Sequence, residues 1–193
     1  INDAPAQASA DVIFANAAGA DIALEAAEVT LKQNDHNALA DDDAIQVGVV
    51  SAPALGRRWW AARGYGAWTT GPESPEPRRI EASSVADLAH ASFSFSDPDN
   101  WEPAVLGELM GRTWRTRAYG DFWSHMLVAE GAVDIAAEVG LSLWDVAALV
   151  PVVEEAGGMF TTLERPAGLM SLTTNRPLHT AALAIIEGRA ATT

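Results

Sequence analysis

The sequence contains no cysteine among its 193 residues, which excludes disulfide bonds and thiolate metal sites. No apolar run approaches the ~20 residues that a membrane-spanning helix needs, so we expect no membrane partner. No signal peptide is visible, although the chain begins at Ile1 rather than at a methionine, which leaves open a natural start further upstream. These absences are typical of a cytoplasmic protein.

Positive charge is also scarce. Lysine and arginine number 12 against 26 aspartates and glutamates, giving a formal net charge of −14. Such a chain repels the phosphates of DNA and RNA, so we expect no nucleic-acid partner. A small anionic ligand would need cations to mediate its binding, which makes the composition compatible with chemistry at a metal ion. The alternative is an acidic surface that only keeps the protein in solution.

Hydrophobic residues make up 49% of the chain, which is enough for a well-packed globular core. No internal repeat, low-complexity segment or long linker divides it. We therefore expect a single domain over residues 1–193.

The most informative stretch is residues 117–158, RAYGDFWSHMLVAEGAVDIAAEVGLSLWDVAALVPVVEEAGG. Its apolar residues recur at four-three-four spacing from Phe122 to Val133, which predicts one helix face. The β-branched run Val133–Ala137 predicts a buried strand. A second helix is predicted from Asp145 to Ala156, because two glycines follow it as a stop signal.

Pro151 lies inside that second helix and should kink it, since proline lacks an N–H and crowds the preceding turn. Asp145 stands at the predicted N-cap, where backbone amides and the helix dipole favour a carboxylate. A capping role is therefore one interpretation of Asp145. The other pairs it with Glu138, seven residues earlier at the exit of the strand, so that the two carboxylates share a divalent cation or hold a polar substrate.

The remaining chain alternates strand and helix patterns. Predicted elements are helices over Asp11–Val29, Val85–Ala89, Glu102–Met110 and His179–Glu187, strands over Val47–Ala52, Ala91–Ser96, Thr113–Ala118 and Met159–Leu163, a hairpin turning at Gly64–Gly66, and loops over Gly71–Arg79 and Glu164–Leu172.

Several polar or aromatic groups have two interpretations. Trp59, Trp60 and Trp68 are compatible with base stacking, but cross-strand aromatic pairs are the simpler account. The acids Asp41, Asp42 and Asp43 are either a metal cluster or a solvated loop, and their role stays open. Asp97-Pro98-Asp99 is interpreted as a turn. His179 is interpreted as a surface residue.

The motifs RAYGDF, then Glu138 and Asp145, then WDVAALVPVVEEAGG resemble the C-terminal half of the inositol monophosphatase family. RAYGDF is most similar to the histidinol-phosphate phosphatase branch. The resemblance covers roughly Val47 to Glu187, including VGVVSAP with its hairpin and the closing Thr173-Thr174-Asn175. It implies the layered αβαβα sandwich of the sugar phosphatases, a Mg²⁺-dependent phosphomonoesterase acting on a small phosphorylated substrate, and a homodimer.

The resemblance also implies roles for individual residues. Asp145 would bind one Mg²⁺, and the helix that it begins would add partial positive charge beside the phosphate. Glu138 and Asp121 would bind the cationic amine or imidazole of histidinol. Gly120 and Phe122 would shape the pocket through their backbone. Asp121 is alternatively an N-cap.

Arg117 is either a charge near the substrate or a structural partner of a carboxylate, and the second is favoured.

Two family motifs that carry metal ligands, G-E-E and W-I-x-D-P-I-D-G-T, are absent before Val47. We expect a segment carrying them between Gln46 and Val47, and the alternative is a genuine deletion that leaves a protein unable to hold its metals. Three functions follow as alternatives: a histidinol-phosphate phosphatase, an inositol monophosphatase or related sugar or nucleotide phosphatase, and a catalytically inactive relative with a structural or interaction role. The water-activating residue cannot be named, because in the family it lies in the absent motifs.

Overall fold

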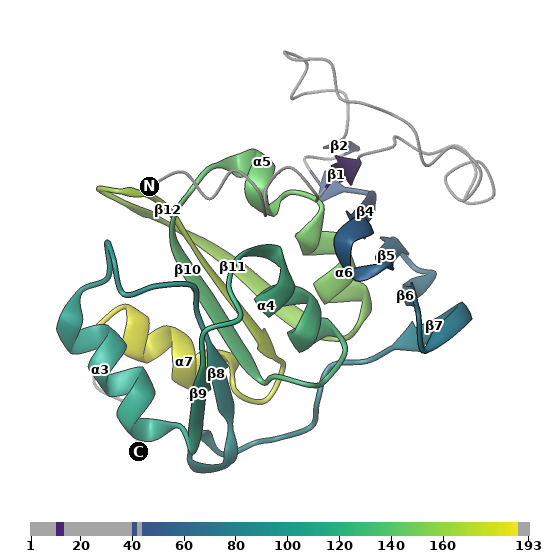
Figure 1. The fold of residues 1–193 in the computed structure, drawn as a ribbon. Helices are drawn as coiled ribbons and strands as arrows, with labels where there is room; N and C mark the ends of the chain where they lie inside the picture. The colour runs from purple at the N-terminus through teal and green to yellow at the C-terminus, as the bar shows by residue number, and fades with distance from the viewer. Residues whose placement is uncertain (1–10, 14–39, 42–43, 189–193) are drawn as a thin grey trace.

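The computed structural model describes residues 11–13, 40–41 and 44–188 of the chain. Two five-stranded sheets dominate it, with helices between them and outside one of them (Figure 1). A two-stranded ribbon precedes the first long strand, formed by β2 (Ala40–Asp41) and β3 (Ala44–Ile45). Within the described residues the layers follow the order sheet, helices, sheet, helices, which agrees with the predicted αβαβα sandwich except for its first helical layer.

The first sheet is antiparallel throughout, in the order β1-β4-β5-β6-β7. Its strands are β1 (Asp11–Ile13), β4 (Val47–Ala52), β5 (Arg57–Ala62), β6 (Gly66–Gly71) and β7 (Ser74–Ile80), with the 3₁₀ turn η1 (Pro53–Leu55) after β4. The prediction of β4 and of the hairpin after it is confirmed. The prediction of a helix starting at Asp11 is wrong over residues 11–13, which pair with β4, and the rest of it lies outside the described residues.

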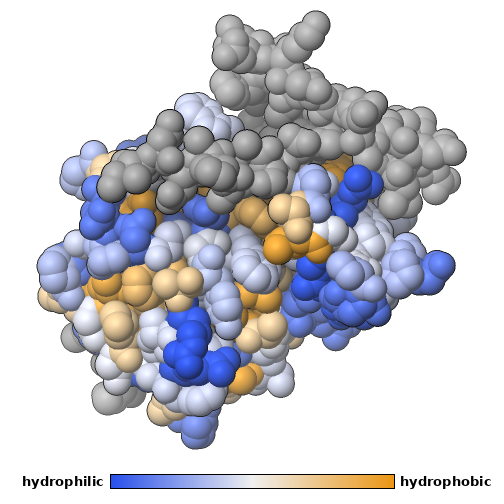
Figure 2. Space-filling model, in the orientation of Figure 1, coloured by the Kyte–Doolittle hydropathy of each residue, from blue (hydrophilic) through white to orange (hydrophobic). Residues whose placement is uncertain are grey.

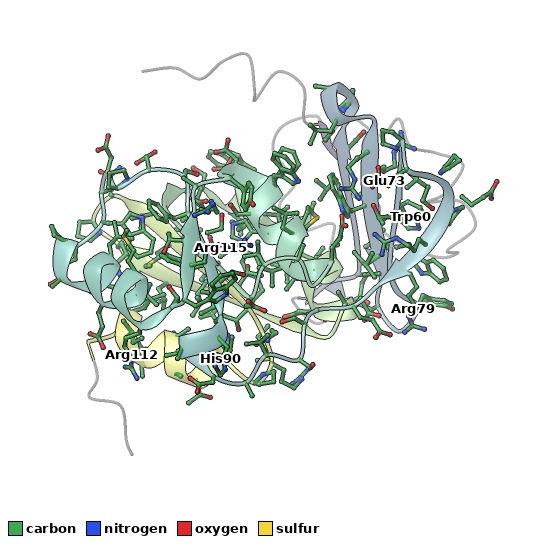
Figure 3. The ribbon with its side chains drawn as sticks, turned by 60° about the horizontal axis from the view of Figure 1, so that its bottom comes forward. Trp60, Glu73, Arg79, His90, Arg112 and Arg115 are labelled. Atoms are coloured by element: carbon green, nitrogen blue, oxygen red, sulfur yellow. The ribbon has the colours of Figure 1, made fainter. Side chains whose placement is uncertain are left out.

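The Pro-rich segment after the hairpin is a strand rather than the predicted loop. Ala67 pairs with Ile80 and Thr69 with Arg78, so the chain adds β7 beside β6. An edge strand tolerates proline because one side of its backbone has no neighbour. Side chains of β7 are mostly exposed, and this side of the molecule is strongly hydrophilic (Figure 2). Glu73 and Arg79 lie here with Trp60 of β5, far from Arg112 and Arg115 (Figure 3).

The second sheet has the order β11-β12-β10-β8-β9 and is mixed. Antiparallel pairs join β11 to β12 and β12 to β10, whereas β10, β8 and β9 run parallel. Its strands are β8 (Ser92–Ser94), β9 (Arg115–Arg117), β10 (Ile135–Leu141), β11 (Gly158–Arg165) and β12 (Gly168–Asn175). The predicted loop over Glu164–Leu172 is therefore wrong: it contains a tight turn at residues 166–167 and most of β12.

Helices form two layers around this sheet (Figure 1). Between the sheets lie α4 (Asp121–Ala129), α5 (Leu143–Val146) and α6 (Leu149–Glu155). On the far side of the second sheet α3 (Pro103–Arg112) packs beside α7 (His179–Ile186), and the 3₁₀ turn η2 (Leu88–His90) precedes β8. α6 contacts β4, β5 and β6 of one sheet and β11 of the other, so this helix joins the two sheets.

The predicted helix over Asp145–Ala156 is two helices. α5 ends at Val146 and α6 begins at Leu149, with a turn at Ala147 and Ala148. Pro151 cannot donate to a carbonyl one turn earlier, so the break falls in the turn that precedes it. The expected kink is thus a full interruption.

One close approach fixes α6 against the first sheet. A Cβ added to Gly48 of β4 would collide with the Ala148 carbonyl oxygen and would lie 2.6 Å from Pro151 Cγ. Glycine is needed at this position because backbone and ring occupy the space of a side chain.

Most tryptophans serve the fold. Trp59 is fully buried among residues of the first sheet, α4 and α6. Trp60 and Trp68 stand opposite each other on β5 and β6, as the cross-strand interpretation predicted. The Trp59 indole N–H donates to Glu130, which also accepts from Arg57 at 3.2 Å. This network attaches the end of α4 to the first sheet.

Candidate functional site

The two faces of the second sheet differ in chemistry. Strand alternation directs Ile135 and Ala137 of β10 into an apolar cluster shared with α3 and α7. The opposite face meets α4 and carries the hydroxyl groups of Ser94, Ser171 and Thr173, all fully buried. Glu138 belongs to this hydroxyl-lined face, since it follows Ile135 and Ala137 out of phase.

Glu138 is the central group of the site. Only 4% of the residue is exposed. Its Oε2 accepts a hydrogen bond of 3.0 Å from the backbone N–H of Ser96, just beyond β8. Its Oε1 is buried without a hydrogen-bond partner among the described residues. A buried carboxylate oxygen without a partner is costly, so this atom is a candidate ligand contact.

Burial raises the pKa of the Glu138 carboxyl from its ordinary value of 4.5 to about 7. Hydrogen bonds from Ser96 lower it, because they stabilise the ionised form, and the negative charges of Asp121 and Asp97 raise it. Perturbed carboxylates of this kind concentrate at functional sites.

Two serines, Ser94 at the end of β8 and Ser96 just beyond it, hold the start of α4. Ser94 Oγ accepts from the Tyr119 N–H at 3.4 Å, and Ser96 Oγ accepts from the Asp121 N–H at 2.9 Å. Gly120 has a φ of 80° and Asp121 a φ of 48°, an uncommon backbone region for aspartate. A Cβ on Gly120 would lie 3.1 Å from Ser96 Oγ. The strained backbone is therefore held beside Glu138 by hydroxyl groups.

The predicted substrate residues near Ser96 differ in how far they are buried. Asp121 is exposed and is the first residue of α4, with Gly120 as the N-cap, so the N-cap interpretation of Asp121 is displaced by one residue. Phe122 is half-buried and packs edge-on against Trp59, with ring centroids 6.2 Å apart. Arg117 is exposed and its guanidinium donates to the Thr116 carbonyl at 2.7 Å. Among the described ion pairs none involves Arg117.

Asp145 occupies the third position of α5, not its N-cap as predicted. Its Oδ2 accepts a hydrogen bond of 2.8 Å from the backbone N–H of Ser142, which is the N-cap. This is the carboxylate half of a capping box. The Asp145 side chain is nevertheless exposed, so its other oxygen stays accessible. The expected dipole contribution beside a phosphate is weaker than predicted, because α5 has only four residues.

The described residues do not complete a divalent-cation site. Among them no three histidine, aspartate or glutamate side chains converge closely enough to hold one metal ion. The charges that act on Glu138 belong to Asp121 and Asp97, not to Asp145. A cation shared by Asp145 and Glu138 therefore stays a prediction, as does the role of Asp145 as a metal ligand. Asp42 and Asp43 lie outside the described residues.

Two histidines that the sequence offered little reason to select are buried. His125 of α4 contacts Thr173 Oγ1 at 2.8 Å and Ser171 Oγ at 3.4 Å. Its burial lowers its pKa from 6.5 to about 4. His179, predicted on the surface, contacts Thr161 Oγ1 and Thr174 Oγ1 at 3.0 and 2.9 Å, and burial lowers its pKa too. That prediction is wrong because α7 begins against the second sheet.

The closing motif Thr173-Thr174-Asn175 is structural in the described part of the molecule. The Asn175 amide donates to Ser83 Oγ and to the Val85 carbonyl, each at 2.8 Å, and accepts from the Leu178 N–H. Ser83 in turn reaches the buried Asp134. Asn175 thus anchors the segment that links the two sheets.

Sequence reasoning missed Ser96 as a site residue. The signal was available, because ASFSFS alternates and places Ser92, Ser94 and Ser96 on one face. Asp97 was interpreted as a turn residue, which is confirmed: its Oδ1 accepts from the Asp99 N–H at 2.8 Å. Its effect on Glu138 could not be read from the sequence.

The chain matches a family model described as the inositol monophosphatase family over residues 37–191. The solved inositol monophosphatase from Anabaena has 28% identity and a TM-score of 0.63, covering 77% of this chain and 61% of that one. Mycobacterium tuberculosis SuhB, at 23% identity and a TM-score of 0.66, covers 77% of this chain and 61% of that one, and shows the fold alone.

Curated relatives are more similar in sequence. A histidinol-phosphatase of Mycobacterium tuberculosis is 53% identical over 149 residues, or 74% of this chain and 57% of the relative. A histidinol-phosphatase of Streptomyces coelicolor is 52% identical over 124 residues, or 61% of this chain and 46% of the relative. The chain thus spans about half the length of the curated relatives that it matches. None of the helices in its described part combines the length and apolar character that a membrane crossing requires.

Proposed function

Because the chain belongs to the inositol monophosphatase family, we propose that it acts as a metal-dependent phosphomonoesterase that converts histidinol phosphate to histidinol and phosphate. Relatives more than 50% identical are histidinol-phosphatases, which supports this choice over inositol phosphate. The observation that carries the proposal is the buried Glu138, whose Oε1 has no partner among the described residues and which shares the contacts of Ser96 with Asp121. Histidinol phosphate carries an amine and an imidazole that suit such a pair.

In this proposal Mg²⁺ supplies charge neutralisation at the phosphoryl oxygens and lowers the pKa of an attacking water. Asp145 is the one described residue that we assign to it, through the carboxylate oxygen that does not accept from Ser142. Further ligands would have to come from outside the described residues. A segment between Gln46 and Val47 that carries them remains a prediction.

We propose that residues of this chain bind the cationic part of the substrate, away from its phosphate. Glu138, fixed through Oε2, offers Oε1 to a cation, and Asp121 adds a second negative charge at the start of α4. Gly120, whose missing Cβ lets the Ser96 hydroxyl approach its backbone, shapes the pocket through that backbone, and Phe122 fixes the angle of α4 by packing on Trp59. Arg117, exposed at the end of β9, is proposed as a charge near the substrate. The negative cluster favours a cationic alcohol over a neutral sugar.

The test is phosphate release from histidinol phosphate, inositol monophosphate and adenosine bisphosphate, each with Mg²⁺ and with a chelator. The proposal is supported if phosphate is released faster from histidinol phosphate than from the other two esters and if the chelator abolishes this release. Preference for inositol monophosphate contradicts the role of Asp121. No release from any ester supports a non-catalytic relative instead.

We further propose a homodimer in the cytoplasm, as the resemblance to the family implies. Light scattering coupled to size-exclusion chromatography decides the oligomeric state. A mass of one chain, 20.3 kDa, would contradict the dimer.

A further inference from the structure

Helix α4 is hydrogen-bonded to both strands that flank Glu138. The order of the second sheet places β10, which carries Glu138, between β8 and β12. On the β8 side, the hydroxyl groups of Ser124 of α4 and Ser94 form a hydrogen bond of 2.8 Å. On the β12 side, the contacts come from the next residue of the helix, His125. Two neighbouring residues of α4 therefore attach it on either side of the strand that carries Glu138.

Both ring nitrogens of His125 have a hydroxyl partner. Nδ1 lies 2.8 Å from Thr173 Oγ1, and Nε2 lies 3.4 Å from Ser171 Oγ. Phe160 of β11 packs against the ring, with centroids 5.5 Å apart. Only 1% of the residue is exposed, and burial lowers its pKa from 6.5 to about 4, so the ring is neutral at pH 7. A neutral imidazole has one donor and one acceptor nitrogen, and a hydroxyl group can serve either.

One of these hydroxyl groups connects the ring to the strand of Glu138. Ser171 is the register partner of Glu138 in the antiparallel pair of β12 with β10. Directly opposite residues of such a pair lie on the same face of the sheet, with Cβ atoms about 4.5–5.5 Å apart. Ser171 thus lies on the β12 side of Glu138, whereas Ser96, whose N–H donates to Glu138, lies on the β8 side. Thr173 lies opposite Ala136, further along the same face.

His125 also shares a helix face with Asp121. The two residues are four positions apart, so they lie one turn apart on the same side of α4. The N–H of Asp121 donates to Ser96 Oγ at 2.9 Å, which holds this turn on the β8 side. Among the described hydrogen bonds, those of His125 are the only ones that join α4 to β12. Without them, the first turn of the helix would lose its described polar contacts to that strand.

We infer that His125 is a positioning residue of the candidate site, which sets the separation of Asp121 from Glu138. It acts through its two hydroxyl partners on β12 and does not touch the ligand, because its ring is buried. The identity of the ligand, a cationic alcohol, rests on the proposed function. An apolar side chain in place of the ring would leave both hydroxyl groups buried without this partner, which is unfavourable, so the first turn of α4 would shift.

The test compares two buried histidines of the full chain by isothermal titration calorimetry with L-histidinol, which carries no phosphate. His125→Leu should bind histidinol about ten-fold more weakly than the wild type, since displacement of one carboxylate weakens one charged hydrogen bond to the ligand. His179→Leu is the matched control. His179 also contacts two hydroxyl groups, at 3.0 and 2.9 Å, but at the start of α7 on the other face of the sheet. This control should bind like the wild type.

A milder pair of substitutions on β12 makes the same comparison if His125→Leu does not fold, which circular dichroism shows. Ser171→Ala removes one hydroxyl partner of His125, and Thr174→Val removes one of His179. Ser171→Ala should bind histidinol more weakly than the wild type, and Thr174→Val should not. Wild-type affinity in the folded His125→Leu or Ser171→Ala variant overturns the inference. So does an equal loss in the matched control, since that would be a general effect of lost packing.

A measurement without ligand separates this inference from the proposed function. The negative charge of Asp121 raises the pKa of the Glu138 carboxyl, so this pKa, titrated by NMR, should fall when Asp121 moves away. We expect the fall in His125→Leu and not in His179→Leu. If the wild type binds no histidinol, a fall confined to His125→Leu upholds the inference and contradicts the proposed substrate. An unchanged pKa of Glu138 in His125→Leu overturns the inference, whichever ester the protein hydrolyses.

Discussion

Ser96 holds Glu138 through its backbone: the N–H of Ser96 donates to Glu138 Oε2 at 3.0 Å. The two residues come from neighbouring parallel strands or their ends, since Ala136 of β10 pairs with Ser94 of β8. Because the same serine accepts from the Asp121 N–H, one residue fixes the relative positions of a strand, a turn and a helix start.

Removal of the Ser96 hydroxyl should change the ionisation of Glu138. Hydrogen bonds from Ser96 stabilise the carboxylate, so Ser96→Ala should raise the pKa of Glu138 further above 7. Titration of the carboxyl carbon by NMR measures this directly. Ser94→Ala, which affects a serine two residues earlier that contacts Tyr119 and Ser124, should leave the pKa of Glu138 unchanged. A fall in the pKa of Glu138 in Ser96→Ala would contradict the assigned contact.

Glu138 should reduce stability at neutral and alkaline pH. Its folded pKa of about 7 lies above its ordinary value of 4.5, so the unfolded chain ionises first and stability is lost as pH rises from about 4.5 through 7. The two pKa values differ by about 2.5, which corresponds to about 3 kcal/mol in the free energy of unfolding. Glu138→Gln should remove this loss and be more stable than the wild type at pH 8, while binding histidinol more weakly.

Urea denaturation between pH 4 and pH 8 measures the difference. Glu164→Gln, at an exposed carboxylate of β11, serves as the control and should follow the wild-type profile. If Glu138→Gln were less stable than the wild type at pH 8, the buried carboxylate would be a net structural contributor.

His125 should destabilise the protein in acid. Burial lowers its pKa from 6.5 to about 4, so the unfolded chain binds a proton first and stability falls as pH decreases from about 6.5 to 4. The difference corresponds to about 3 kcal/mol. In His125→Gln this component should disappear from the pH profile of the free energy of unfolding. The exposed His90 provides the control, and His90→Gln should keep the wild-type slope.

Two substitutions at Asp145 distinguish its capping role from its proposed role as a Mg²⁺ ligand. Asp145→Asn keeps an oxygen that accepts from the Ser142 N–H, so its stability should match the wild type, whereas phosphate release should fall by at least about 100-fold if the carboxylate binds Mg²⁺. Asp145→Ala should lose about 1 kcal/mol of stability as well. Thermal denaturation and phosphate assays on both variants give the answer. An active Asp145→Asn enzyme would leave Asp145 with a capping role only.

Much of the architecture could be predicted from local patterns. β4 and the hairpin after it were predicted from a short apolar run and from the glycines of the turn. The spacing of apolar residues after Phe122 predicted α4, which ends at Ala129, four residues earlier than expected. The strand expected at Val133–Ala137 is longer and later, because Glu138 and Gly140 continue it around a bulge. A buried glutamate and a bulged glycine give no strand signal on their own.

The site itself was predicted only in part. Glu138 was selected from its place at the exit of a predicted strand as well as from the resemblance, Asp121 from the resemblance alone, and the structure places both beside Ser96. The contribution of Ser96 and Asp97 depends on the parallel pairing of β8 with β10, which is a contact between segments about 40 residues apart. The spacing of apolar residues indicates which face of a strand or helix is buried. It does not indicate which other strand lies beside it, so the pairing of β8 with β10 could not be predicted from the sequence.

The packing of α4 on both of its sides has a mechanical consequence. Towards the second sheet, His125 contacts buried hydroxyl groups. Towards the first sheet, Met126 is fully buried in an apolar cluster with Trp59, and exposing such surface to water is unfavourable. Displacement of α4 therefore disturbs both layers at once, so the spacing between Asp121 and Glu138 is set before any ligand binds.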